Sequence, residues 1–164
     1  MRYAGLIEND IVNGQGVCVS VWFQGCPHRC PGCHNPESWD FDGGQAIERN
    51  ELITKILSAI GANGIQRNLS LLGGEPFCDQ NIEDAYYITV AAKAAYPDIT
   101  VYGWTGSWYE DLLKKDNPFY QKTLQFVDVL IAGPFDLAAR DVTLHLRGSN
   151  NQIIHDLREM REKE

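Results

Sequence analysis

The sequence predicts an α/β fold, built as an incomplete, open (β/α) barrel of about five to six units. Segments rich in β-branched and aromatic residues alternate along the chain with segments whose apolar residues recur at helical spacing. Right-handed crossovers between parallel strands bring the carboxyl ends of such strands to one edge. The chain has 164 residues, whereas a complete eight-unit barrel typically needs about 250 residues. The barrel is therefore expected to remain open.

The first half of the chain predicts two strands and two helices. Residues 17–25, "VCVSVWFQG", are β-rich and end at a cysteine-rich loop, and residues 68–74, "NLSLLGG", are typical of a buried strand. The helix between them is predicted by a single apolar stripe made of Leu52, Ile53, Ile56, Leu57 and Ile60. The second helix is expected to be capped by Asp79 and to end before Pro97.

The second half predicts three more strands, at residues 99–104, 127–133 and 142–148. Ser107 and Glu110 have the spacing of a capping box, which predicts a short helix after the first of these strands. Residues 151–164 are expected to form a charged tail that is helical or frayed.

Composition limits the kind of protein. A hydrophobic content of 44% in a chain of this length fits one domain, residues 1–164, with a core that needs no disulfides. The net charge of -8 argues against binding to nucleic acid. The chain has no apolar run of roughly 18 residues and no signal-peptide pattern, and its cysteine count of five is odd. We therefore expect a cytoplasmic protein without membrane or nucleic-acid partners.

Polar and glycine-rich turns follow most of the predicted strands. If these strands are parallel, their carboxyl ends form one active-site edge. The turns expected at this edge are the cysteine-rich loop 25–36, "GGEP" (73–76), "GWTG" (103–106), "AGPF" (132–135) and "RGSNN" (147–151).

The cysteine-rich loop, "GCPHRCPGCHNP", indicates a metal centre. Its thiols, from Cys26, Cys30 and Cys33, lie in a loop punctuated by glycine and proline, where they are free to surround one centre. Soft thiolates favour zinc or iron–sulfur chemistry. A closed zinc site would take His28 or His34 as its fourth ligand. A cubane cluster of four irons would instead keep one iron without a protein ligand, and that iron would be available for chemistry.

These motifs resemble those of the radical S-adenosylmethionine (radical SAM) superfamily. Its hallmark C-x-x-x-C-x-x-C matches Cys26, Cys30 and Cys33, and its second element matches "GGEP" on the same predicted edge. The resemblance implies a 4Fe–4S cluster whose open iron binds the amino and carboxylate groups of S-adenosylmethionine. It assigns cofactor binding to residues of the two motifs, namely Gly32, Cys33, His34, Gly73, Gly74 and Glu75. Many members carry an aromatic residue where this chain has Gly32.

Within the superfamily, the chain is similar to the activating proteins of anaerobic (class III) ribonucleoside-triphosphate reductases. The similar segments cover nearly the whole chain and include "DIVNGQGVCVSVWFQGCPHRCPGCHNPESWDF", "LSLLGGEPF", "VYGWTGSWYEDLL", "DVLIAGPF" and "LRGSNNQIIHDL". One departure is Ala132, since the family commonly has an acidic residue there, so that either Asp128 or Asp136 compensates for it or its role is lost.

The resemblance implies a radical-generating enzyme without a protein acid or base. An electron from the cluster breaks the S–C5′ bond of S-adenosylmethionine, giving methionine and a 5′-deoxyadenosyl radical, which takes a hydrogen atom from a glycine Cα of the reductase. A flavodoxin- or ferredoxin-type protein would donate the electron. The alternative enzymes are the pyruvate formate-lyase activating enzyme and a small radical SAM synthase. The alternative outside enzymes is a zinc or electron-transfer module.

Other notable residues are assigned mostly to packing. Cys18 and Cys78 are interpreted as small buried side chains and not as ligands. His145 is interpreted as a surface or core residue, and the aromatic residues Tyr102, Trp104 and Trp108 as packing residues. The polar turn with Arg147, Ser149 and Asn150 is a candidate for binding the cofactor's carboxylate or ribose.

Overall fold

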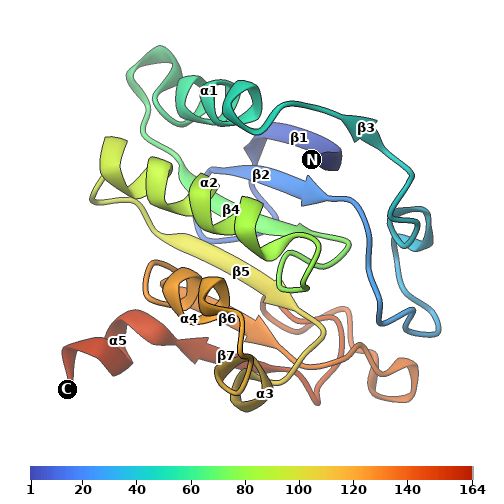
Figure 1. The fold of residues 1–164 in the computed structure, drawn as a ribbon. Coiled ribbons are helices and arrows are strands. Elements are labelled where there is room, and N and C mark those ends of the chain that lie inside the picture. The colour runs from blue at the N-terminus through green and yellow to red at the C-terminus, as the bar shows by residue number, and fades with distance from the viewer. Residues whose placement is uncertain (164) are drawn as a thin grey trace.

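The computed structural model describes residues 1–163 and contains one mixed seven-stranded sheet, in the order β3-β1-β2-β4-β5-β6-β7 (Figure 1). The strands are β1 (Arg2–Asp10), β2 (Cys18–Phe23), β3 (Gln45–Ala46), β4 (Asn68–Gly73), β5 (Val101–Thr105), β6 (Val129–Ala132) and β7 (Ile153–Asp156). Strands β2, β4, β5 and β6 are parallel to their neighbours in this series, whereas β1, β3 and β7 run antiparallel at the two sides. The α/β class and the open sheet are confirmed. The expected count of five to six β/α units is too high, because only four strands form the parallel series.

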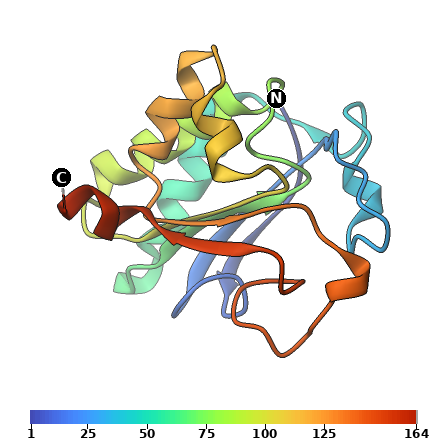
Figure 2. The ribbon, with the colours of Figure 1, turned by 90° about the horizontal axis from the view of Figure 1, so that it is seen from below.

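Helices cover one face of this sheet. They are α1 (Arg49–Ile60), α2 (Ile82–Ala95), α3 (Tyr109–Leu113), α4 (Pro118–Leu124) and α5 (Leu157–Glu162). The 3-10 turns η1 (Pro36–Ser38), η2 (Ala62–Gly64) and η3 (Leu137–Ala139) lie in the connecting loops. Helices α1, α2 and α4 pack side by side across the same face, and the long loop between β6 and β7 runs beneath the opposite face (Figure 2). None of these helices is long and apolar enough to span a bilayer, as far as residue 163.

The alternation of side chains along the parallel strands creates two different faces. In β2, Val19, Val21 and Phe23 belong to the core beneath the helices, whereas Ser20 and Trp22 point to the opposite face. Strand β4 repeats this pattern, so both faces of the central strands are covered by protein, as is usual for parallel sheets. The predicted stripe of α1 is confirmed, since Leu52, Ile56 and Ile60 are buried and Ile53 and Leu57 pack against the same core.

Both predicted helix caps are wrong. The residue before α2 is Asn81, and Asp79 instead accepts a hydrogen bond from the Tyr120 hydroxyl at 2.7 Å. The predicted box at residues 107–110 is not formed, because α3 starts after Trp108 and has no side-chain cap. Helix ends packed against a core obtain their stability from tertiary contacts, which override cap signals in the sequence.

The predicted strand 142–148 is also wrong. These residues form turns, with Leu146 at a φ of 61°, which lies outside the range for strands. Their alternating leucines face a cavity, where the Leu146 carbonyl accepts a hydrogen bond from Trp104 Nε1 at 2.9 Å. The last strand is β7 instead, which pairs antiparallel with β6 within the segment expected to be a tail. Strand β1 and helix α4 were not predicted from the sequence.

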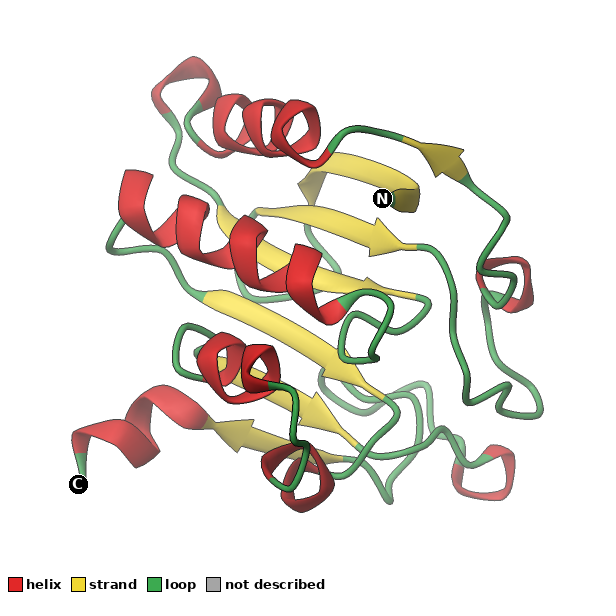
Figure 3. Ribbon diagram, viewed as in Figure 1, coloured by secondary structure: helices red, strands yellow, loops and turns green. Residues whose placement is uncertain are grey.

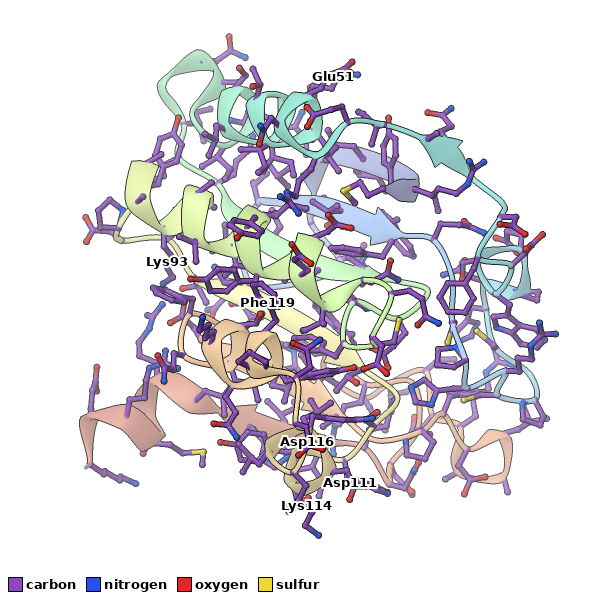
Figure 4. All side chains as sticks on the ribbon, viewed as in Figure 1. Glu51, Lys93, Asp111, Lys114, Asp116 and Phe119 are labelled. Atoms are coloured by element: carbon purple, nitrogen blue, oxygen red, sulfur yellow. The ribbon has the colours of Figure 1, made fainter. Side chains whose placement is uncertain are left out.

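A buried carboxylate fastens α5 to the sheet. Asp128, at the amino end of β6, lies 2.6 Å from Lys93 Nζ, 3.0 Å from Arg158 and 3.1 Å from Arg161, and it accepts a hydrogen bond from the Val101 N–H. Lys93 lies on α2 (Figure 4), and its Nζ donates the hydrogen bond to Asp128. Burial alone would raise the pKa of Asp128, but the hydrogen bonds from Arg158, Lys93 and Val101 outweigh burial and lower this pKa below its ordinary value.

We predict that Asp128→Asn lowers the free energy of unfolding by about 3 kcal/mol at pH 7, because it leaves three cations without their buried partner. Since the folded pKa of Asp128 is depressed, its contribution is present above the unfolded pKa of about 3.9 and is lost as the pH falls through the folded pKa. Urea unfolding of both proteins from pH 7 to pH 3 measures this difference, which should shrink toward pH 3. Asp98→Asn, at an exposed position, is the matched control. Equal stability of Asp128→Asn and the original chain at pH 7 would contradict this account.

Candidate functional site

A cavity of about 530 Å³ lies at the carboxyl edge of the parallel strands, on the face opposite the helices. The loops that follow these strands gather at this edge (Figure 3). The floor of the cavity is formed by Trp22 of β2, Leu72 of β4 and Trp104 of β5, and the segment 142–148 covers it. The expected convergence of the strand ends is confirmed, because the cysteine-rich loop, "GGEP", "GWTG", "AGPF" and "RGSNN" all contribute residues to its wall.

The cysteine-rich loop leaves the sheet through a glycine turn. Gly25 has a φ of 97°, which favours glycine, and its N–H donates to the Ser38 carbonyl at 2.7 Å. The N–H of Cys26 donates to the Trp39 carbonyl at 3.2 Å, so the loop is closed at its base by backbone hydrogen bonds. Left-handed conformations at Arg29 and Gly32 then fold the loop tightly between its cysteines.

The thiols of Cys26, Cys30 and Cys33 are free, partly buried and placed on the wall of this one cavity. Cys18 and Cys78 are also free but buried away from the wall, as predicted. Burial raises the pKa of Cys26 to about 11, so in the chain alone this group is a neutral thiol. Binding of a metal would release its proton, because thiolate is the ligand form.

Three free thiols on one wall fit a cluster of four irons. Within residues 1–163, no three His, Cys, Asp or Glu side chains are grouped as ligands around one metal ion. In a cluster of four irons each thiolate binds a separate iron, so the three thiols need to share a wall without meeting at one point. His28, a candidate zinc ligand, is hydrogen-bonded to Glu75, and the ring of His34 packs 5.5 Å from that of Phe135.

Gly73, the last residue of β4, and Gly74 pack against the cysteine-rich loop of residues 25–36, called the cluster loop below. The N–H of Gly74 donates to the Phe23 carbonyl at 2.8 Å, and the next N–H donates to the Gly25 carbonyl at 2.8 Å. A Cβ on Gly73 would lie 2.6 Å from the Phe23 nitrogen, and one on Gly74 would overlap the Gly25 carbonyl and lie 2.9 Å from the Ser38 oxygen. These positions therefore need glycine, because a side chain there would meet the backbone of β2 and of the cysteine-rich loop.

Glu75 lies behind the cavity wall and is only 1% exposed. Its Oε1 accepts hydrogen bonds from the Thr105 hydroxyl at 2.9 Å and from the Gly106 N–H at 2.8 Å, and it lies 2.6 Å from His28 Nε2. Its Oε2 accepts from the Phe77 N–H at 3.0 Å. The hydrogen bond to Glu75 raises the pKa of His28 above its ordinary value against the opposing effect of burial.

The structure brings most of the predicted site residues together. Those on the cavity wall are Cys26, Cys30, Cys33, His34, Gly73 and Gly74. Gly32 and Glu75 are outside the wall. Gly32 has a φ of 77°, and a Cβ there would lie 2.7 Å from a methyl group of Leu137, so Leu137 occupies the space that an aromatic neighbour of the last cysteine would need.

Of the polar turn after residue 146, only part lies on the cavity wall. Arg147 lies on the wall and donates to the Gln152 carbonyl at 3.2 Å. Ser149 is fully buried and its hydroxyl accepts from the Asp136 N–H, while Asn150 is exposed, so neither lines the cavity. Trp104, predicted as a packing residue, does line it. Nothing in the sequence separates Trp22, Leu72 and Trp104 from core residues, because both faces of buried parallel strands are apolar.

Neither candidate replacement for the missing acid at Ala132 is on the wall. Asp128 is buried among its cations at the other end of β6. Asp136 caps η3 by accepting from the Ala138 N–H at 3.0 Å. The cavity therefore has no acidic side chain in its lining, as far as residue 163.

Comparison with known proteins agrees with this geometry. A family model described as a 4Fe-4S single cluster domain matches residues 12–155. The anaerobic ribonucleoside-triphosphate reductase-activating protein of Salmonella typhi is 34% identical over 96% of this chain and 100% of its own length. The chain belongs to this family of activating proteins. Members from Escherichia coli K12 and bacteriophage T4 are 32% and 33% identical, over 96% and 93% of this chain and 100% and 92% of their own lengths.

Membership in the reductase-activating protein family decides between the interpretations left open by the cysteines. The family model describes a single 4Fe–4S cluster, so the chain is an iron–sulfur activating enzyme and the zinc module is set aside. The match begins before β2 and ends within β7, so it includes every strand of the parallel series.

We predict that Gly74→Ala destabilises the chain by about 2 kcal/mol, or roughly 6 °C in Tm, because its Cβ would meet backbone atoms of the cluster loop that no side-chain rotation can move. Gly5→Ala is the control, since its Cβ meets nothing within 4 Å. Thermal unfolding followed by circular dichroism measures both. A Gly74→Ala variant as stable as Gly5→Ala would contradict the close packing of β4 against the loop.

Proposed function

We propose that this chain is the radical SAM enzyme that activates an anaerobic ribonucleoside-triphosphate reductase by generating a glycyl radical on it. The observation that carries the proposal is the common wall shared by three free thiols and the backbone of Gly73 and Gly74. Such an enzyme requires soft donors that leave one iron open. It also requires a strand end, here with Gly73 and Gly74, whose backbone a ligand can approach closely. The names of the similar proteins supply the target, the anaerobic ribonucleoside-triphosphate reductase.

The proposed roles follow from position. Cys26, Cys30 and Cys33 hold the cluster, and Gly73 and Gly74 receive the methionyl amino group of S-adenosylmethionine. The N–H groups of Gly74 and Glu75 are already used in pairing with β2 and the loop. An amino group donates hydrogen bonds and needs carbonyl oxygens as acceptors, so the use of these N–H groups elsewhere does not prevent its binding.

The backbone of Cys33 and His34, on the same wall, is proposed to meet the adenosine. Gly32 and Glu75 are proposed to act from behind the wall, through packing and hydrogen bonds, although the motifs suggested direct binding. Arg147 is proposed to bind the carboxylate or ribose, since its guanidinium lies on the wall and its buried Nε has no hydrogen-bond partner among the described residues.

The cavity suits a radical reaction. Its volume of about 530 Å³ lies within the range of about 300–1,000 Å³ found for ligand sites. When bound, the cluster and cofactor supply a one-electron cleavage that yields a 5′-deoxyadenosyl radical. The chain's own contribution is orientation and exclusion of water, which the floor of Trp22, Leu72 and Trp104 provides.

The open sheet and the free thiols support three wider proposals. The sheet is proposed to be a shortened form of the radical SAM barrel, open so that a glycine of the reductase can enter. All five cysteines are free thiols, which favours a reducing compartment, proposed to be the cytoplasm. The electron donor is proposed to be a flavodoxin or ferredoxin, and neither nucleic acid nor membrane is proposed as a partner.

We predict that the chain, reconstituted with iron and sulfide without oxygen and then reduced, converts S-adenosylmethionine to 5′-deoxyadenosine. Cys30→Ala should abolish this product, and Cys18→Ala, which removes a buried thiol outside the wall, should retain it. Addition of the reductase should give a glycyl radical signal in electron paramagnetic resonance. Tight stoichiometric zinc without turnover, or full turnover in Cys30→Ala, would contradict the proposal.

A further inference from the structure

The cluster loop has few contacts of its own with the sheet edge. Its base is closed by backbone hydrogen bonds at Gly25 and Cys26, but between residues 27 and 34 the backbone bond from Cys33 to Cys30 stays within the loop. Among the described residues, His28 is the only side chain of residues 26–34 that hydrogen-bonds to a strand end. His28 lies midway between Cys26 and Cys30, so its contact bears on the placement of both thiols.

The acceptor of this contact is held independently of the loop. Glu75 receives three hydrogen bonds from elsewhere, those of Thr105 at the end of β5, of Gly106 directly after it and of Phe77 next to the "GGEP" turn. A buried carboxylate with three fixed donors is pre-organised before His28 reaches it. Loss of the His28 contact would therefore release the loop and leave Glu75 in place.

The position of the imidazole is also shaped by packing. A Cβ on Gly106 would lie 2.6 Å from His28 Cδ2 and 2.9 Å from its Nε2, so the ring rests directly on the Gly106 backbone. Buried ion pairs contribute little net stability compared with apolar residues, because desolvation offsets their attraction. Such a contact is better explained by the geometry that it fixes.

We propose that His28 and Glu75 form a positioning pair, which holds the cluster loop in register with Gly73 and Gly74 so that the cluster and the methionyl group of S-adenosylmethionine meet at the correct place. The pair joins the segment between the first two cysteines to the ends of β4 and β5. This inference rests on the proposed function and assigns Glu75 to positioning and not to cofactor contact.

The test compares His28→Leu, which removes the donor, with His28→Gln, whose amide N–H can replace the imidazole Nε2. His28 lies on the cavity wall, and His155→Leu is the control for loss of an imidazole elsewhere, because His155 lies on β7 outside the cavity and its buried Nε2 has no partner among residues 1–163. Each full-length protein is reconstituted with iron and sulfide, and its iron content is measured. The reduced cluster is titrated with S-adenosylmethionine by electron paramagnetic resonance. Hydrogen exchange of residues 28–34 is measured by mass spectrometry.

His28→Leu is expected to keep its fold, to exchange faster only at residues 28–34, and to need about tenfold more S-adenosylmethionine for the spectral change. His28→Gln is expected to stay within about twofold of the original chain, and His155→Leu to match it. If His28→Leu fails to hold iron while faster exchange is confined to residues 28–34, the pair still positions the loop.

Equal titrations for His28→Leu and the original chain, equal defects in His28→Gln and His28→Leu, or faster exchange across the whole sheet would each overturn the positioning role. A reconstituted original chain whose spectrum does not respond to S-adenosylmethionine refutes the proposed function instead. In that case, the exchange data alone decide whether the pair holds the loop.

Discussion

The parallel pairing of β2 with β4 is the constraint on which the site depends. Its register places Phe23 opposite Gly73, so the cysteine-rich loop and the "GGEP" turn leave the sheet side by side. The two turns are then joined by backbone hydrogen bonds from Gly74 and Glu75 to Phe23 and Gly25. Side chains at the two glycines would force these turns apart. The cysteine-rich loop therefore lies beside Gly73 and Gly74 because of backbone contacts between the two turns.

One face of the sheet carries the hydrophobic core, and the other carries the cavity. Beneath the helices, the alternate residues of β2 and β4 join a continuous apolar core. On the other face the same strands present Trp22 and Leu72 to a cavity, which the turns of residues 142–148 cover. A helix on this face would fill the space that a nucleoside-sized ligand requires. The turns of residues 142–148 therefore cover the cavity in place of a helix.

Features that depend on short stretches of the chain could be predicted from the sequence. Three cysteines, two glycines and the β-rich segments before them identified the edge, because parallel strands end together whatever their detailed packing. Features that depend on contacts between distant parts of the chain could not be predicted from it. Residues 142–148 alternate like a strand, yet their leucines face the cavity, and β7 takes the edge of the sheet beside β6. The motif predicts Glu75 on the wall, but Thr105 at the end of β5 and Gly106 directly after it, both remote in sequence, hold its carboxylate behind the wall.

The central claim is a cluster held by three cysteines, with one iron open to the cavity. Mössbauer spectroscopy of the chain reconstituted with ⁵⁷Fe, before and after addition of S-adenosylmethionine, tests it most directly. The account predicts that one of the four irons of the cluster changes its isomer shift when the cofactor binds, while the other three keep theirs. Four irons unaffected by the cofactor, as expected when every iron has a protein ligand, would contradict it.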